Sequence, residues 1–389
     1  MADDHVVHEA VGAPIAPLAA GAALYLGVLA LLISGEIPIL LGGFADQHRL
    51  SISGIGMAAA AEGLTMAAAA ALAGLFLPPR HLRLVAAAAS LALALSDWSV
   101  ARASGDIAVV GLRAVAGIPE GVLLWITIGM ISRSVLPERW AAVLATLATG
   151  TQLASSALLS AGLLTRLGSS GVFELFAAVS LTGAVVALAA PRRYAPLAAG
   201  DQVLGNNPPA RGWAALAATF VFLAADGAVG VYIAPLAQAA RLTAETAQTA
   251  ISWSLVAQLA GSAMAVVLAG RVGYFAVFVF GVAGQVVCYL VYGLLATNWI
   301  FEAITAMESL GVALVTPFLV PMTIEADPTR RAALQIGAVQ VLGAACGPLM
   351  ASLLVSGARV TNVLWLGSAM ALVSLAIVIG LRVRRAAVA

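Results

Sequence analysis

Long runs of hydrophobic residues recur along this chain, separated by short polar segments. Twelve runs reach or nearly reach the roughly 20 apolar residues that a helix needs to cross a hydrocarbon core about 30 Å thick. They are rich in Ala, Leu and Val and lack a period of two, which favours helices over the short strands of a membrane barrel. The expected spans are 17–43, 53–77, 84–101, 107–131, 141–164, 172–190, 213–236, 247–269, 274–296, 300–323, 333–356 and 360–381.

The twelve runs form two matching sets of six. The segment PERWAA (Pro137–Ala142) recurs as PTRRAA (Pro328–Ala333), and the pair Gly35 and Arg49 recurs about one period later as Gly227 and Arg241. The sequence therefore predicts an all-α membrane protein with two pseudo-symmetric six-helix bundles, at 17–190 and 213–381. A tail over 1–16, a linker over 191–212 and a tail over 382–389 are expected to be cytoplasmic.

Composition and charge agree with this organisation. Hydrophobic residues make up 62% of the 389 residues, charged residues make up 10%, and the mean hydropathy is +1.03, which excludes a water-facing globule. All basic side chains except histidine are Arg. With both termini inside, thirteen Arg fall on the linker side and five on the other, which favours a bacterial inner membrane protein with cytoplasmic termini.

Several kinds of chemistry have no support in the sequence. A chain without lysine cannot contain the phosphate-binding loop GxxxxGK[ST]. The four histidines fall in tails or loops, and Cys288 and Cys346 fall inside spans, where packing is the expected role. We expect no enzyme activity, cofactor, metal or nucleic-acid partner. We expect the protein to be a monomer whose transport is driven by an ion gradient.

The fourth span carries the most specific local resemblance to a known family. It reads Leu112-Arg113-Ala-Val-Ala-Gly117-Ile-Pro-Glu120-Gly121, and the eleventh span contains Gly343-Ala-Ala-Cys-Gly347-Pro348. With the twelve-span duplication, these segments resemble the major facilitator superfamily of secondary transporters. The resemblance implies that spans 1, 2, 4, 5, 7, 8, 10 and 11 line a central cavity while 3, 6, 9 and 12 face lipid. The loop at Gly74–Arg83 departs from the family's acidic and basic motif.

Carboxylates inside the spans are the candidate proton-coupling groups, because a charge in the bilayer rarely persists without a partner or a cavity. They are Glu36, Glu62, Glu120, Asp226 and Glu308. Three of them have a specific structural alternative: Glu36 can satisfy the helix break at Pro38, Glu62 can bond a neighbouring helix, and Glu120 can pair with Arg113. Asp97, Asp106 and Glu174, near outer ends, are expected to be solvated.

Candidate substrate-binding residues are the single intramembrane Arg and polar or aromatic side chains on the cavity spans. They are Arg113, Gln152, Gln258, Gln340, Trp125, Trp253 and Tyr232. Five carboxylates around one Arg would make the interior acidic, which favours cationic or amphiphilic solutes. The predicted function is proton-coupled export of such solutes by alternating access. Proton-linked symport of a small organic acid held by Arg113 is an alternative, and a non-transporting receptor or assembly factor is another.

Overall fold

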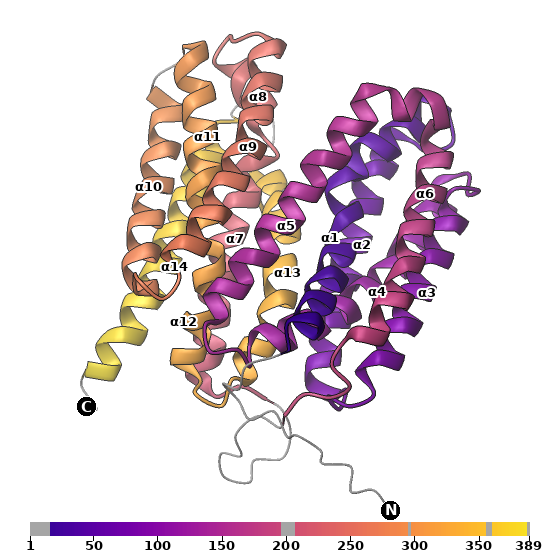
Figure 1. Ribbon diagram of the computed structural model, residues 1–389. Coiled ribbons are helices and arrows are strands. Elements are labelled where there is room, and N and C mark those ends of the chain that lie inside the picture. Colours follow the sequence, from indigo (N-terminus) through magenta and orange to yellow (C-terminus); the bar gives the residue numbers. More distant parts are fainter. Residues whose placement is uncertain (1–15, 196–206, 295–296, 355–359, 387–389) are drawn as a thin grey trace, which may run out of the picture.

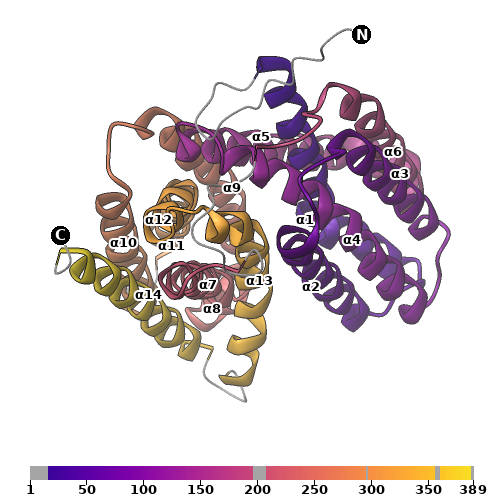
Figure 2. The same ribbon diagram turned by 90° about the horizontal axis from the view of Figure 1, so that it is seen from below.

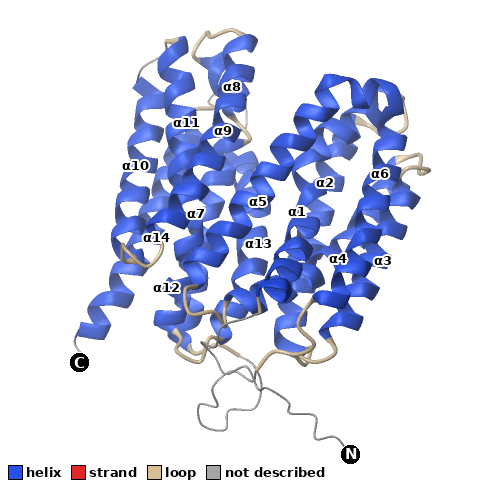
Figure 3. Cartoon of the chain, viewed as in Figure 1, coloured by secondary structure: helices blue, strands red, loops and turns tan. Residues whose placement is uncertain are grey.

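The computed structural model describes residues 16–195, 207–294, 297–354 and 360–386, with only the backbone described at 34–35, 37–39, 42, 45–46, 52–53, 160, 244, 353–354 and 384–386. The expected tails and linker lie partly outside these residues. The described part of the chain is almost entirely helical and contains no strand, as Figure 3 shows.

The first half contains six principal helices, and a short helical segment follows each of the last two. They are α1 (Pro17–Asp46), α2 (Ile52–Phe76), α3 (Leu82–Val100), α4 (Asp106–Ile131), α5 (Pro137–Leu158) with η1 (Leu159–Leu163), and α6 (Leu164–Val186) with η2 (Ala187–Ala189). The chain reverses between α5 and α6 at Gly162 and Gly168, which adopt the positive φ angles that glycine tolerates.

The second half repeats the pattern with two interrupted spans. Its elements are α7 (Ala210–Gly230), α8 (Ile233–Ala239), α9 (Ala244–Leu268), α10 (Tyr274–Leu294), α11 (Asn298–Val315), η3 (Thr316–Phe318), α12 (Leu319–Ala326), α13 (Arg331–Leu354) and α14 (Asn362–Ala386). The tenth expected span is divided at η3, where Pro317 lacks the N–H that a continuous helix needs. The seventh is broken after Gly230, and the helix resumes at Ile233.

The prediction of twelve spans in two halves is confirmed. Among the described residues, eleven segments are long and apolar enough to cross a membrane, and α1 adds a helix of 30 residues whose described apolar part is Pro17–Ile33. Figures 1 and 2 show α3 and α6 at the outer edge of one half and α10 and α14 at the outer edge of the other. These are spans 3, 6, 9 and 12, which the resemblance placed toward lipid.

The halves meet through α2 against α13 and α5 against α9. Figure 1 shows them together at the end that carries residues 195 and 207, and diverging toward the α1–α2 and α7–α8 connections. At the joined end, Arg330 Nη1 donates to the carbonyl oxygens of Ser132 at 2.6 Å and Ser134 at 3.2 Å, and Ser132 Oγ donates to the Ala333 carbonyl oxygen at 3.1 Å. The structure is therefore closed at the linker end.

Arg330 belongs to the repeated segment found in the sequence. It follows Pro328 by two residues, as Arg139 follows Pro137 in the first half, but Arg139 is exposed. Beside this junction, burial lowers the pKa of Arg133 to about 10, and its guanidinium lies over the Tyr194 ring at 5.1 Å. Of the two copies of the duplicated segment, the second one, through Arg330, thus helps to close the linker end.

Candidate functional site

Three carboxylates surround Arg113 inside the first half. Glu62 Oε2 accepts a hydrogen bond from Arg113 Nε at 2.7 Å, and Glu62 Oε1 lies in ion-pair contact with Nη2 at 2.5 Å. Asp97 Oδ1 accepts a hydrogen bond from Nη1 at 2.9 Å, and Glu120 Oε1 accepts one from Nη2 at 3.4 Å. All four side chains are at most 1% exposed. We call these four residues the Arg113 cluster. If every carboxyl were ionised the cluster would carry two net negative charges, so the charge balance favours a bound proton.

Glycines on α4 position the Arg113 cluster. A Cβ at Gly117 would overlap Thr65 Oγ1 and the Glu62 carbonyl oxygen, and a Cβ at Gly121 would overlap the Met66 carbonyl oxygen. The helices α2 and α4 therefore approach at a distance that only small residues permit. This close contact brings Glu62 against Arg113 from the neighbouring helix.

The prediction that Asp97 is solvated is wrong. Its side chain is fully buried, pairs with Arg113, and accepts a bond from Ser180 Oγ on α6 at 3.4 Å. The connection from α3 to α4 is short, so a residue near the end of α3 lies within reach of a long side chain in the second turn of α4. Glu174, by contrast, lies at the surface in an ion pair with Arg102 in which both side chains are 49% exposed.

A pair of carboxyl groups lies inside the other half, where the side chain of Asp226 on α7 is within reach of that of Glu308 on α11. Glu308 Oε1 also accepts bonds from Tyr289 O–H at 3.2 Å and Gln285 Nε2 at 3.5 Å, both on α10. Tyr289 O–H lies 3.2 Å from the Ala225 carbonyl oxygen as well. We call Asp226 and Glu308 the carboxyl pair; among the described residues no basic side chain is within ion-pair distance of it.

The two clusters occupy related positions in the repeat. Arg113 and Glu120 lie on the fourth span and Glu308 on the tenth, while Asp97 lies on the third span and Tyr289 on the ninth. Both therefore extend from the fourth or tenth span into the helix before it, which lies at the outer edge of its half. Sequence reasoning did not single out Ser180, Gln285 or Tyr289; the spacing of Gln285 and Tyr289 by four residues on one helical face is the pattern that points to them.

Glu36 lies apart from both clusters. It is fully buried on α1 and accepts bonds from Ser156 Oγ on α5, at 3.2 Å and 3.0 Å to its two oxygens. One turn away on α5, Gln152 Nε2 donates to the Leu31 carbonyl oxygen at 2.7 Å. Both polar contacts join α1 to α5. The side chain of Pro38 lies outside the described residues.

The remaining predicted residues lie in varied environments. Trp125 is buried in the apolar core, and Trp253 is 54% exposed on α9. Tyr232 lies at the break between α7 and α8, and Gln258 and Gln340 are partly buried on α9 and α13. The structure does not gather these side chains into one site with Arg113.

Comparison with known sequences and with solved structures gives different results. No family model and no curated protein matches the chain. Among solved structures, the major facilitator transporter FucP in the outward conformation matches with a TM-score of 0.75 and 12% identity, over 94% of this chain and 99% of that one. The proton:xylose symporter XylE, bound to 6-bromo-6-deoxy-D-glucose, matches with a TM-score of 0.69 and 15% identity, over 92% and 93%.

A third solved structure, the human organic anion transporter MFSD10 (TETRAN), matches with a TM-score of 0.69 and 16% identity, over 94% of this chain and 100% of that one. At these identities the likeness establishes the fold alone. The resemblance noted in the fourth and eleventh spans agrees with it, and the chain has the fold of the major facilitator superfamily of transporters.

Proposed function

We propose that the chain is a proton-coupled secondary transporter that exports cationic or amphiphilic compounds by alternating access. The observation that carries the proposal is the carboxyl pair. Asp226 and Glu308 lie within reach of one another inside the second half, and no basic partner compensates them among the described residues.

The carboxyl pair can exchange a proton for a cation. Two adjacent carboxyl groups away from bulk water repel one another when both are ionised, so one proton stays between them. A cationic solute supplies the compensating charge instead, and its arrival releases the proton. Coupling follows if the protonated and cation-bound forms favour opposite conformations, since a ligand shifts such an equilibrium only through differential affinity.

The Arg113 cluster supports an acidic interior rather than an anion site. Nε, Nη1 and Nη2 of Arg113 all have carboxylate partners. A substrate carboxylate would have to displace one of them. This occupancy argues against organic-acid symport, which stays the second candidate because MFSD10 is an organic anion transporter and XylE a proton symporter.

Binding of a lipophilic cation tests the substrate class. Tetraphenylphosphonium is expected to bind the purified protein at neutral pH and to bind more weakly as pH falls, because protonated carboxyl groups no longer attract it. The measurement is a titration of labelled cation in nanodiscs at several pH values. An organic acid that binds tightly through Arg113, together with no response to cations, would replace this proposal with the symport reading.

We also propose that the linker end is cytoplasmic. Arg80, Arg133, Arg193 and Arg330 gather at this end of the structure: Arg80 and Arg193 pair through their backbones, Arg133 Nε donates to the Ala195 carbonyl oxygen, and Arg330 bridges the halves. Positive charge is retained on the cytoplasmic side of bacterial membranes. The divergent end would then face outward.

Single cysteines test this orientation. In a Cys288→Ala, Cys346→Ala background, Asn207→Cys is expected to resist a membrane-impermeant thiol reagent in intact cells, while Ser104→Cys is labelled. Both positions are exposed. Permeabilised cells are the control, in which both should react. Labelling of Asn207→Cys in intact cells, with protection of Ser104→Cys, would reverse the orientation.

A further inference from the structure

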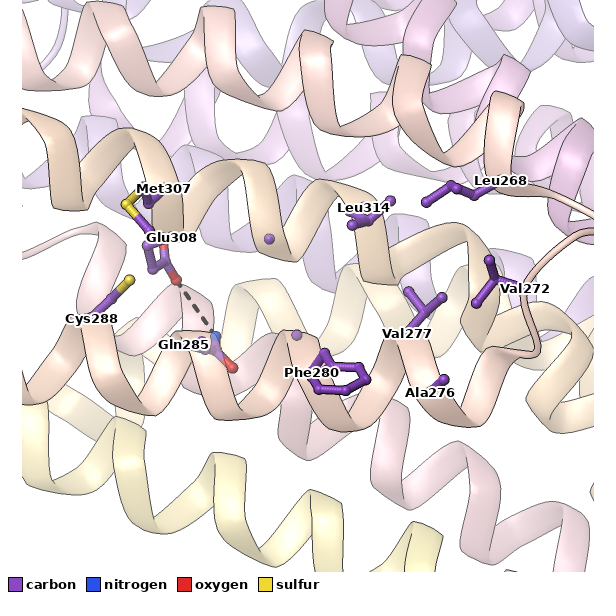
Figure 4. Close-up of a pocket in the computed structure, with 13 residues that line it drawn as sticks. Leu268, Val272, Ala276, Val277, Phe280, Gln285, Cys288, Met307, Glu308 and Leu314 are labelled. Carbon is purple, nitrogen blue, oxygen red and sulfur yellow. Dashed lines mark hydrogen bonds between the residues drawn. The ribbon is translucent and has the colours of Figure 1, made fainter.

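An apolar groove runs along the outer side of the second half, between α10, α11 and the end of α9 (Figure 4). Its volume is about 360 Å³, and its walls include Leu268, Val277, Phe280 and Leu314. Phe280 is 77% exposed on the outer edge of the structure, so the groove is open toward the bilayer. Hydrocarbon can therefore enter it sideways.

The groove has one polar end. Glu308 and Gln285 line it, and both are more than nine-tenths buried. Gln285 Nε2 donates to Tyr289 O–H at 2.9 Å and to Glu308, but Gln285 Oε1 has no hydrogen-bond partner. Figure 4 shows this oxygen directed away from Glu308, on the side of Phe280. A buried carboxylate and an unpaired acceptor thus lie at the polar end of the groove, and both suit a donor with positive charge.

The other end opens at the linker side of the molecule. Leu268 ends α9, and Ala276 lies in the first turn of α10. The connection between them approaches the first half, where a Cβ at Gly270 would lie 3.3 Å from Leu136. From Ala276 to Gln285 is nine residues, about 13 Å along the helix. The groove therefore leads from one membrane leaflet to the carboxyl pair.

We propose that this groove is a lateral entry site for a single-chain alkylammonium cation from the linker-side leaflet. The ammonium group bonds Glu308 and Gln285 Oε1, and the alkyl chain lies along Val277, Phe280 and Leu314. A neutral lipid chain leaves Gln285 Oε1 without a hydrogen-bond partner, and the phosphate of a phospholipid is repelled by Glu308. The inference rests on the proposed function, because it names the route by which a membrane-dissolved cation reaches the carboxyl pair.

Cys288 also lines the groove at its polar end and allows a local readout. In the Cys346→Ala protein it is the single thiol. At ten times its half-protecting concentration, decylammonium is expected to slow modification of Cys288 by methyl methanethiosulfonate in nanodiscs about tenfold. Decanol and decanoate, which have the same chain without the positive charge, are expected to change the rate by less than about twofold.

Three variants locate the ligand, and binding of labelled decylammonium gives a second readout for each. Glu308→Gln removes the charge, and Gly311→Leu fills the groove, since a Cβ at Gly311 meets nothing within 4 Å. Each is expected to weaken decylammonium binding at least about tenfold, which is the scale of one charge-assisted hydrogen bond. Gly380→Leu on α14, where a Cβ also meets nothing within 4 Å, is the matched control and should bind as the parent does.

Equal protection by decanol and decylammonium, or full protection in Glu308→Gln, would overturn the entry site and leave a groove that holds hydrocarbon only. Failure of the proposed function gives a different result. Decylammonium would then bind and protect Cys288 as expected, while a pH gradient would drive no cation across the membrane. Gradient-driven export that persists unchanged in Gly311→Leu would overturn the entry site and leave the proposed function standing.

Discussion

Replacing Arg113 with Met is expected to lower the free energy of unfolding by about 3–5 kcal/mol, the cost of removing one partner from a buried charge network. The guanidinium is fully buried and compensates Glu62, Asp97 and Glu120. Without it, three carboxyl groups in the same dry site must take up protons or leave the helix interface. Unfolding in mixed micelles with increasing sodium dodecyl sulfate measures the difference.

Arg102 provides a matched control for Arg113. It also pairs with a carboxylate, Glu174, at 2.9 Å, but both side chains are half exposed. Arg102→Met is expected to cost no more than about 1 kcal/mol, as is usual for surface ion pairs. Glu62→Gln added to Arg113→Met should recover part of the loss, because it removes one uncompensated carboxylate. Equal effects of Arg113→Met and Arg102→Met would contradict the role assigned to the Arg113 cluster.

Neutralising either member of the carboxyl pair is expected to abolish uphill transport. Each unit of pH gradient is worth about 1.36 kcal/mol, and so supports up to about tenfold accumulation when one proton exchanges for one solute. Asp226→Asn or Glu308→Gln removes the group that exchanges the proton, so accumulation should fall to the level of passive equilibration. Uptake of labelled cation into proteoliposomes with and without a pH gradient measures this ratio.

Glu302 on the same helix as Glu308 is the control for this experiment. It is only partly buried and lies almost two turns nearer the start of α11. Glu302→Gln should accumulate solute as the parent does, and downhill exchange should persist in Asp226→Asn if binding survives. Normal pH-driven accumulation in both Asp226→Asn and Glu308→Gln would remove the carboxyl pair from the coupling mechanism and shift attention to Glu36 and Glu120.

The helical layout follows directly from the sequence because every span must satisfy its backbone internally. The expected span 107–131 is α4 (Asp106–Ile131), and 247–269 is α9 (Ala244–Leu268). Prolines and glycines mark the interruptions: Pro317 divides the tenth span, and Gly230 precedes the break in the seventh. Hydropathy does not determine how the helices are arranged around one another. Side-chain contacts between different helices were therefore harder to predict.

Asp97 illustrates that limit. Its position near the outer end of a span suggested that it is solvated, but depth along the helix does not determine which face is buried. An intramembrane Arg must find partners within one side-chain length, and the neighbouring helix of a short hairpin is the first place to search. The same reasoning points from Glu308 toward α10, where Gln285 and Tyr289 contact it.

Proton movement driven by a cation tests the central claim most directly. Proteoliposomes that contain the protein, a pH-sensitive dye and an acidic lumen are exposed to a lipophilic cation. The account predicts that the lumen becomes more alkaline as the cation enters in exchange for protons, and that Asp226→Asn and Glu308→Gln proteoliposomes show no such change. Cation entry without proton movement in the parent protein, or proton movement elicited only by organic acids, would contradict it.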